Sequence, residues 1–286
     1  MGTAATAPAV AGPNRPHHPE APMPDTGRLP SRTTPRSAEE VTLSDYRAVL
    51  FDLDGVITPT ADLHRDAWRA MFTDVLADRG VDPYSEQDYF DHLDGRSRTE
   101  GVASLLASRG ITLPHDRADA GEEGEDSPED DTVVGLGLRK NREFLRLLDA
   151  GITPYPGSVR LLDALEDGAD TRAVRVAVVS SSRNARRVLR AAGLLDRFEL
   201  VVDGEVAARE GLAGKPAPDT YLHAARELGV EPGAAVVVED ATSGVAAGRA
   251  GDVGLVVGVD RGAGAEALRA AGADVVVPDL ARLVEP

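Results

Sequence analysis

The chain of 286 residues carries 31 Lys and Arg against 48 Asp and Glu, so its formal net charge is −17, and it contains no Cys. No uninterrupted apolar stretch approaches the roughly 20 residues that span a bilayer, which excludes a membrane span and predicts a soluble globular protein. The lack of Cys excludes disulfides, thiolate nucleophiles and Cys-ligated metal centres, while the acidic balance argues against nucleic acids and anionic membranes as partners.

Residues 1–42 are predicted to form a disordered tail. This segment holds eight of the 19 prolines together with many Ala, Thr and Ser, and it has almost no aliphatic periodicity. Such a composition cannot bury enough apolar surface to offset the entropy of ordering. The segment also lacks the cationic start and continuous apolar stretch of a secretory signal. The absence of Cys leads us to expect a cytoplasmic protein.

From residue 48 onward, short apolar runs alternate with helical stretches. The predicted strands cover residues 48–51, 174–179, 200–202, 235–238, 253–259 and 274–277. The predicted helices cover residues 184–192, 219–228, 242–250 and 263–271, and a Gly follows each of them. Gly stops a helix because it adopts the left-handed conformation without a side-chain clash. This alternation predicts an α/β fold: a Rossmann-like, mostly parallel sheet flanked by helices.

Residues 64–154 break the alternation and show helical spacing of apolar residues, beginning with Trp68, Met71 and Phe72. Because strands are predicted on both sides, this stretch is expected to be a helical cap domain inserted after the first strand. Residues 43–63 and 155–286 would then form the core domain. Within the cap, residues 116–131 contain nine acidic residues and one Arg, which predicts a solvated surface loop.

Reactive side chains follow three of the predicted strands. The first strand is followed by Asp52 and Asp54, the second by Ser180 and Ser182, and the fourth by Glu239 and Asp240, while Lys215 lies in a connecting segment. In open parallel sheets, ligands bind outside the carboxyl ends of the strands, so these residues are expected to meet at one edge.

Four converging carboxylates would repel one another without a cation, and hard oxygen ligands with no His or Cys nearby indicate Mg²⁺. A carboxylate aimed at phosphorus can act as a nucleophile, for which Asp52 is the candidate. Asp54 could then protonate the leaving oxygen, and Ser180 and Lys215 could hold the phosphoryl oxygens. The predicted reaction class is phosphoryl transfer.

Four segments resemble the motifs of the haloacid dehalogenase superfamily of phosphotransferases, in the order found in that family. They read FDLDGVIT, VVSSSRN, GKPAPD and VVVEDATSG. Within the superfamily the chain is most similar to the β-phosphoglucomutases and their phosphatase relatives, which carry a helical cap after the first motif.

The resemblance implies roles for individual residues. It makes Asp52 the nucleophile and a metal ligand, and Asp54 the general acid/base whose carbonyl also binds the metal. It also implies that Glu239 and Asp240 complete the Mg²⁺ site, that Ser180 and Lys215 hold the transferring phosphoryl group, and that Ser182, Arg183 and Asn184 lie beside that group. Thr60 and His64 would couple cap closure to the acid/base. Arg98 and Lys140 would contact the substrate from the cap, with Arg98 binding its non-reacting phosphate.

Three functions remain open on this basis. The first is a mutase that interconverts β-glucose 1-phosphate and glucose 6-phosphate through a bisphosphate, and the second is a phosphatase on a sugar phosphate or a similar small phosphomonoester. The third is a non-catalytic protein that has kept the fold, against which the intact Asp52, Asp54, Lys215 and Asp240 argue. The expected partner is a phosphorylated sugar, and the expected state is a monomer.

Overall fold

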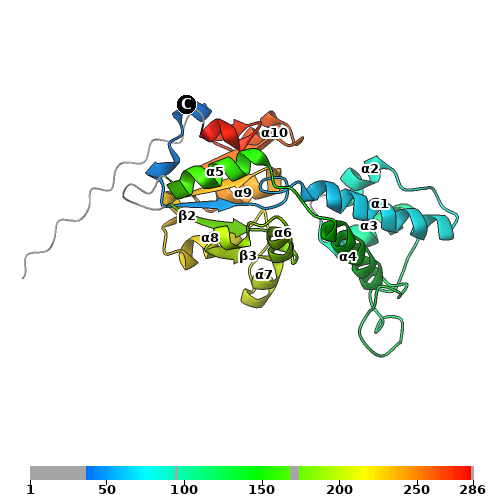
Figure 1. The fold of residues 1–286 in the computed structure, drawn as a ribbon. Coiled ribbons are helices and arrows are strands. Elements are labelled where there is room, and N and C mark those ends of the chain that lie inside the picture. Colours follow the sequence, from blue (N-terminus) through cyan, green and yellow to red (C-terminus); the bar gives the residue numbers. More distant parts are fainter. Residues whose placement is uncertain (1–36, 94–95, 168–173, 285–286) are drawn as a thin grey trace, which may run out of the picture. The chain divides into compact units, whose positions relative to one another are not determined.

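The computed structural model describes residues 37–93, 96–167 and 174–284, and within them the chain forms one parallel six-stranded sheet (Figure 1). The strand order is β3-β2-β1-β4-β5-β6. The strands are β1 (Ala48–Phe51), β2 (Arg175–Val179), β3 (Leu200–Val202), β4 (Ala235–Glu239), β5 (Leu255–Val259) and β6 (Val275–Val277). All six lie within or next to the predicted apolar runs, and the predicted α/β class is confirmed.

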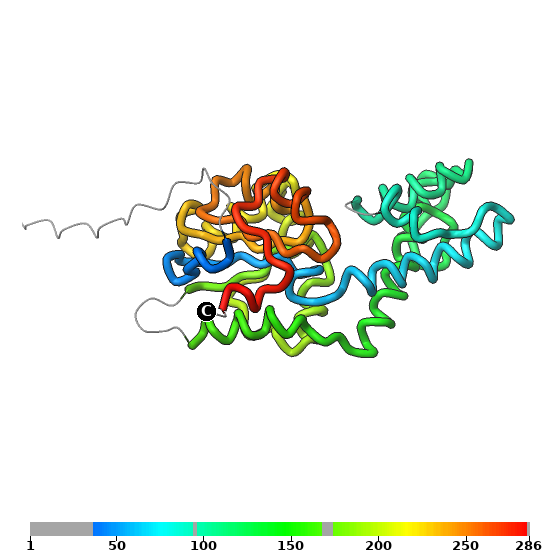
Figure 2. Tube along the Cα trace, turned by 90° about the horizontal axis from the view of Figure 1, so that it is seen from above, coloured from blue at the N-terminus to red at the C-terminus, as the bar shows by residue number. Residues whose placement is uncertain are grey.

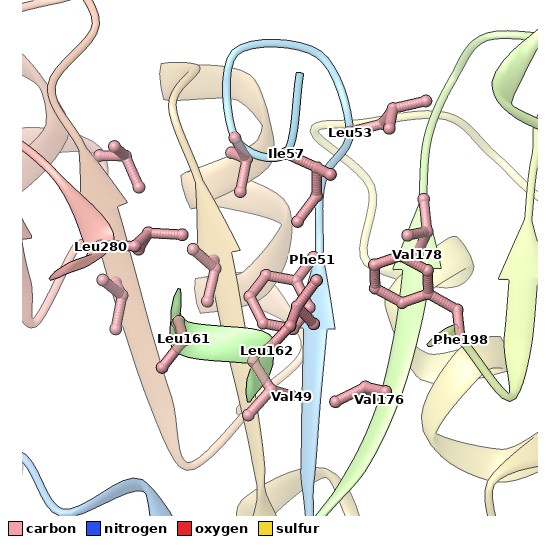
Figure 3. Close-up of a cluster of buried hydrophobic side chains, with 14 of the residues drawn as sticks. Val49, Phe51, Leu53, Ile57, Leu161, Leu162, Val176, Val178, Phe198 and Leu280 are labelled. Carbon is pink, nitrogen blue, oxygen red and sulfur yellow. The ribbon is translucent and has the colours of Figure 1, made fainter. Parts of the chain in front are cut away.

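Successive side chains of each strand point to opposite faces of the sheet, so both faces are apolar. On β1, Val49 and Phe51 face one cluster of buried residues, while Ala48 and Leu50 face another. Figure 3 shows the first cluster, in which Phe51 lies among residues from neighbouring strands and from Leu161 and Leu162 of helix α5.

Helices cover both faces of this sheet. The first cluster includes residues of α5 (Pro156–Asp167) and α6 (Ala185–Ala191), and the second includes residues of α8 (Asp219–Glu227), α9 (Thr242–Ala250) and α10 (Ala265–Ala271). The short helix α7 (Gly204–Glu210) follows β3. The sequence pattern did not predict α5 and α7.

Three of the four glycines predicted to stop helices have the left-handed backbone: Gly193, Gly229 and Gly272. Helix α9 also ends just before Gly251, as predicted, but the left-handed conformation expected of this glycine is wrong, since its φ is −82°. There the left-handed residue is Asp252, at φ 49°. A Cβ on Gly251 would lie 3.3 Å from Cβ of Pro218, so this glycine lets the end of α9 approach the start of α8 closely.

Between β1 and α5 the chain forms a helical insert with its own apolar core, which Figure 2 shows from blue-cyan to green. Its helices are α1 (Thr60–Asp78), α2 (Glu86–Asp88), the π-helical turn η3 (Tyr89–Leu93), α3 (Arg98–Ser108) and α4 (Val133–Asp149). Trp68 and Phe72 of α1 stack in that core, with ring centroids 5.5 Å apart. Helix α1 begins at Thr60 and continues through residue 64, where the cap domain was predicted to begin, so the helix itself marks no boundary there. The predicted domain boundaries remain a prediction.

The acidic stretch 116–131 is organised around its one cationic residue. Arg117 forms ion pairs with Glu122 and Asp130, both at 2.9 Å, and its Nε donates to the carbonyl of Glu123. Of the predicted disordered tail, residues 1–36 lie outside the described residues, and residues 37–42 include the 3₁₀ turn η1 (Ala38–Glu40). In the part of the chain that the structure describes, no helix is both long and apolar enough to cross a membrane.

Candidate active site

The sheet order reverses between β1 and β4, and in doubly wound sheets this is the point where a crevice for ligands opens. The two strands pair in parallel, with Phe51 opposite Val238, and the amide of Asp52 donates to the carbonyl of Val238 at 2.9 Å. This register places Asp52 beside Glu239 and Asp240 at the carboxyl ends of both strands.

Lys215 joins two of these carboxylates. Its Nζ lies 2.5 Å from Oδ1 of Asp52 and 2.7 Å from Oε1 of Glu239, and it also donates to the carbonyl of Val179 at 3.1 Å. Burial opposes the charge on the ammonium group, but the two carboxylates outweigh burial and raise the pKa of Lys215 well above its ordinary value. Lys215 is therefore a fixed cation next to Asp52.

Asp240 has no such partner, since among the described residues no Lys or Arg forms an ion pair with it. Burial, together with the charges of Glu239 and Asp54, raises the pKa of Asp240 to about 8. Gly55 makes room for this carboxylate, because a Cβ there would lie 1.9 Å from Oδ2 of Asp240. The charge of Lys215 lowers the pKa of Asp240 but does not offset these effects.

A divalent cation fits this cluster. Ligand atoms of Asp52, Glu239 and Asp240 all lie within 4.8 Å of one another. They are hard oxygen ligands, which Mg²⁺ prefers, and the unpaired Asp240 carboxylate would gain the countercharge it lacks. Oδ1 of Asp52 and Oε1 of Glu239 both accept from Lys215, so Asp240 is the least committed of the three ligands.

Asp54 is held at the start of α1. Oγ1 of Thr60, the first residue of that helix, donates to Oδ1 of Asp54, and Ser180 also hydrogen-bonds to this carboxyl. Burial raises the pKa of Asp54 against the lowering effects of Thr60 and Lys215. A carboxyl with a raised pKa can carry a proton near neutral pH, as a general acid requires.

One turn along α1, His64 meets Lys140 of α4. Nζ of Lys140 lies 2.5 Å from Nδ1 of His64, and the imidazole stacks on Phe144 at a centroid distance of 4.2 Å. Burial, together with the charge of Lys140, lowers the pKa of His64 well below 6.5, and burial together with Arg98 lowers the pKa of Lys140 to about 7. His64 is thus neutral and can accept a hydrogen bond from Lys140, and the charged form of Lys140 interacts with Asp54.

The loop after β2 forms a chain of hydrogen bonds. Oγ of Ser180 accepts from the amide of Ser182, and Oγ of Ser182 accepts from the amide of Asn184, both at 3.1 Å. The Asn184 side chain donates to Oδ1 of Asn141 on α4 at 2.8 Å, and Nη2 of Arg98 donates to the same oxygen at 3.0 Å. Arg183 is exposed, and its charge lowers the pKa of Arg98, as burial does.

The structure thus arranges the predicted site residues in two groups. The first holds Asp52, Asp54, Thr60, Ser180, Lys215, Glu239 and Asp240, and the second holds His64, Arg98, Lys140, Ser182, Arg183 and Asn184. Two contacts link the groups. Oγ of Ser180 accepts from the backbone amide of Ser182, and the charge of Lys140 interacts with that of Asp54.

The sequence reasoning missed three residues that support these groups. Tyr221 of α8 donates to Oε1 of Glu239 at 3.0 Å, and its ring lies 5.0 Å from Nζ of Lys215. Asn141 joins Arg98 to Asn184. Tyr221 looks like a core aromatic in its helix, and Asn141 was visible only as the neighbour of Lys140.

Arg261, in the loop after β5, is the third supporting residue that the sequence reasoning missed. Its Nε donates to the carbonyl of Gly55 at 3.1 Å, its Nη1 donates to the carbonyl of Pro278 at 3.2 Å, and its guanidinium lies 3.9 Å from the centre of the Tyr155 ring. The amide of Tyr155 donates to the carbonyl of Ile57 at 3.0 Å. Arg261 therefore contacts both segments that connect the helical insert to the sheet, and no sequence pattern marks it.

Comparisons with known proteins show which family the chain resembles. The sequence profile of the haloacid dehalogenase-like hydrolases matches residues 46–252. A β-phosphoglucomutase of Mycobacterium bovis is 49% identical over 256 residues, covering 83% of this chain and 91% of that protein. A fructose-1-phosphate phosphatase of Escherichia coli is 31% identical over 212 residues, covering 74% of this chain and 95% of its own.

The fold agrees as well. The crystal structure of a β-phosphoglucomutase from Clostridium difficile superposes with a TM-score of 0.62 at 27% sequence identity, covering 83% of this chain and 93% of that one.

Proposed function

Because the chain belongs to the haloacid dehalogenase-like hydrolase family, we propose that it is a Mg²⁺-dependent phosphotransferase that interconverts β-glucose 1-phosphate and glucose 6-phosphate through a phosphorylated aspartate. The similarity to a β-phosphoglucomutase over most of both chains supports this choice of substrate. One observation carries the proposal: Asp52 lies at the switch point of the sheet, bound to Lys215 and within metal-sharing distance of Asp240.

In this proposal Asp52 is the nucleophile. The Lys215 ammonium fixes the carboxylate and neutralises charge on the phosphoryl oxygens as they approach. Ser180 donates a hydrogen bond to those oxygens from the end of the neighbouring strand. Splitting one displacement into two steps through phosphorylated Asp52 lowers the barrier of each.

Asp54 moves the protons. When Asp52 is phosphorylated, Asp54 takes the proton of the sugar 6-hydroxyl. The 6-oxygen bonds to the phosphorus, and the bond between the phosphorus and the Asp52 oxygen breaks. The resulting bisphosphate rebinds in the opposite orientation. An oxygen of Asp52 then bonds to the phosphorus at C1, the bond to the C1 oxygen breaks, and Asp54 returns its proton to that oxygen. Glucose 6-phosphate leaves, and the enzyme is again phosphorylated.

The Mg²⁺ ion would be held by the carboxylates of Asp52 and Asp240 and by the backbone carbonyl of Asp54. Glu239, which also accepts a hydrogen bond from Lys215, would complete the site. When bound, the ion supplies Lewis-acid stabilisation of the phosphoryl oxygens. The unpaired charge of Asp240 and the space left by Gly55 support this assignment.

A bisphosphate needs positive charge at both ends. Lys215 serves the reacting end, and Arg98, Arg183 and Lys140 would serve the other. Phosphatase activity on a sugar phosphate is the second candidate, favoured by the similarity to a fructose-1-phosphate phosphatase. In that case water takes the place of the sugar hydroxyl.

The decisive measurement is ³¹P NMR of the enzyme with Mg²⁺, β-glucose 1-phosphate and a trace of the bisphosphate. We expect the signal of glucose 6-phosphate to replace that of the substrate, whereas release of inorganic phosphate would indicate the phosphatase. The substitution Asp52→Asn should abolish both reactions, and turnover by that variant would refute the aspartyl-phosphate mechanism.

A further inference from the structure

One side-chain oxygen receives two donors that come from distant parts of the sequence. Oδ1 of Asn141 accepts from Nη2 of Arg98 at 3.0 Å and from Nδ2 of Asn184 at 2.8 Å. A guanidinium has only donors, so the atom of Asn141 that faces Arg98 must be the oxygen, and Asn184 must therefore turn its amide nitrogen toward it. The donor and acceptor roles of all three side chains follow from this.

Helix α4 is shaped to receive Arg98. Gly137 lies one turn before Asn141 and so shares its face of the helix. A Cβ on Gly137 would lie 3.1 Å from Cδ and 3.3 Å from Cγ of Arg98. The arginine stem thus lies against a bare stretch of helix, and its charged end reaches the amide oxygen one turn further on.

The partner of Arg98 is neutral. Within the described ranges no carboxylate forms an ion pair with this guanidinium, and burial together with the charge of Arg183 lowers the pKa of Arg98. An acidic residue at position 141 would orient Arg98 and also cancel its charge. An amide orients it and leaves the positive charge available to an anion.

The same oxygen connects Arg98 to the phosphoryl side of the site. Asn184 is buried, and its backbone amide donates to Oγ of Ser182, whose own backbone amide donates to Oγ of Ser180. Five residues therefore form one continuous series of hydrogen bonds from the candidate phosphoryl ligand Ser180 to the guanidinium of Arg98, in which the two links at Ser182 use backbone amides and the two at Asn141 use side chains.

We infer that Asn141 is a positioning residue that sets the selectivity for substrates with a second anionic group. It holds Arg98 charged and correctly oriented, and it ties this grip to the loop that binds the reacting phosphoryl group. The inference rests on the proposed function, because it assumes that Arg98 meets the non-reacting phosphate of a sugar phosphate. Asn141 itself acts through Arg98 and Asn184.

The test is a double-mutant cycle of Asn141→Ala and Arg98→Ala, measured on β-glucose 1-phosphate and on p-nitrophenyl phosphate, which has no distal phosphate. We expect Asn141→Ala to lower kcat/KM for the sugar phosphate about tenfold, mainly through KM, and by less than about twofold when Arg98 is already Ala. The loss on p-nitrophenyl phosphate should be less than about threefold. Arg142→Ala, at the next and exposed position of α4, is the control and should match the wild type.

A second variant separates positioning from support of the fold. Asn141→Asp keeps an oxygen that accepts from both donors, so it should restore the melting temperature lost in Asn141→Ala. Because its charge pairs with Arg98, it should leave KM for the sugar phosphate high. If Asn141→Asp restores KM together with the melting temperature, a neutral partner is not what keeps the charge of Arg98 available, and the inference is wrong.

Additive losses in the cycle, or equal losses on both substrates, would also overturn the inference while leaving the proposed function intact. The proposed function fails separately, if Asp52→Asn retains turnover or if the wild type transfers no phosphoryl group from β-glucose 1-phosphate. In that event the affinity for glucose 6-phosphate, measured calorimetrically for the same four proteins of the cycle, still decides whether Asn141 acts through Arg98.

Discussion

Asp240 and Gly55 illustrate how single residues define the metal site. The carboxylate of Asp240 fits only because Gly55 has no side chain, and it has no cationic partner of its own among the described residues. Lys215, by contrast, is committed to Asp52 and Glu239. One part of the acidic cluster is therefore neutralised by the protein, and the other part is left to a cation.

Mg²⁺ binding should depend on pH through Asp240. The pKa of about 8 means that this carboxyl holds a proton below that pH in the metal-free protein, and the ion must displace it. The apparent Kd for Mg²⁺ should therefore rise up to about tenfold per pH unit as the pH falls from 8 to 6. Calorimetry at both pH values, in buffers of different ionisation enthalpy, measures the Kd and the released proton. Equal Kd values would contradict the assignment.

The stability of the metal-free protein should change with pH in the opposite direction to the Mg²⁺ affinity. Because the pKa of Asp240 is raised on folding, its favourable contribution is complete below about pH 4 and is lost as the pH rises through 8. Mg²⁺ should therefore raise the melting temperature more at pH 8 than at pH 6.

Gly55→Ala should abolish Mg²⁺ binding. Its Cβ would overlap the Asp240 carboxylate, and the backbone φ of 85° is itself unfavourable for Ala. Gly80→Ala is the matched control, since Gly80 has a φ of 64° but nothing within 4 Å of the added Cβ. The control should lose about 1–2 kcal/mol of stability from backbone strain and still bind Mg²⁺. Calorimetric titration distinguishes the two, and normal binding by Gly55→Ala would refute the role given to this glycine.

At the scale of elements, the connections between the sheet and the helical insert are held by long-range hydrogen bonds. Oγ of Ser158 in α5 donates to the carbonyl of Val56 at 2.6 Å, and the amide of Tyr155 donates to Ile57. Arg261 adds contacts to Gly55 and to the Tyr155 ring. The segment that carries Asp54 is thereby attached to the segment that returns from the insert.

Arg261→Ala should lower the free energy of unfolding by about 2 kcal/mol, because it removes hydrogen bonds from a charged donor and the contact with Tyr155. Denaturant titration measures this change. Arg269→Ala, at an exposed position of α10, is the control and should stay within about 0.5 kcal/mol of the wild type. If the two variants are equally stable, the contacts of Arg261 contribute little.

For the whole molecule, the net charge of −17 implies self-repulsion in the compact state. Added salt screens such repulsion, since the Debye length falls to about 10 Å at 0.1 M. We expect the melting temperature to rise by a few degrees between 10 mM and 300 mM NaCl, measured with EDTA so that the metal site does not contribute. A fall would mean that surface ion pairs, such as that of Arg142 with Glu129, outweigh the repulsion.

The sequence by itself determined the elements and the reactive residues of the sheet edge. Runs such as Ala48–Phe51 are apolar at every position, which is the requirement of a strand covered on both faces. Asp52 follows this run directly, and Glu239 and Asp240 follow the apolar run of β4. The alternation of strands and helices then sufficed to predict the α/β class, because both signals are local. The end of α9 shows the limit, since the left-handed residue there is Asp252 and not Gly251, which lies close to the start of α8.

Only the tertiary structure decided which side chains share a partner. Tyr221 with Glu239, Arg261 with Gly55, and Asn141 with both Arg98 and Asn184 are contacts between residues 18, 206 and 43 positions apart. Such contacts leave no periodicity in the chain, because they depend on where whole elements come to rest against one another. The lowered pKa of Lys140, about 7, has the same origin: a lysine on a helix is buried against a neutral histidine only after α1 and α4 have packed.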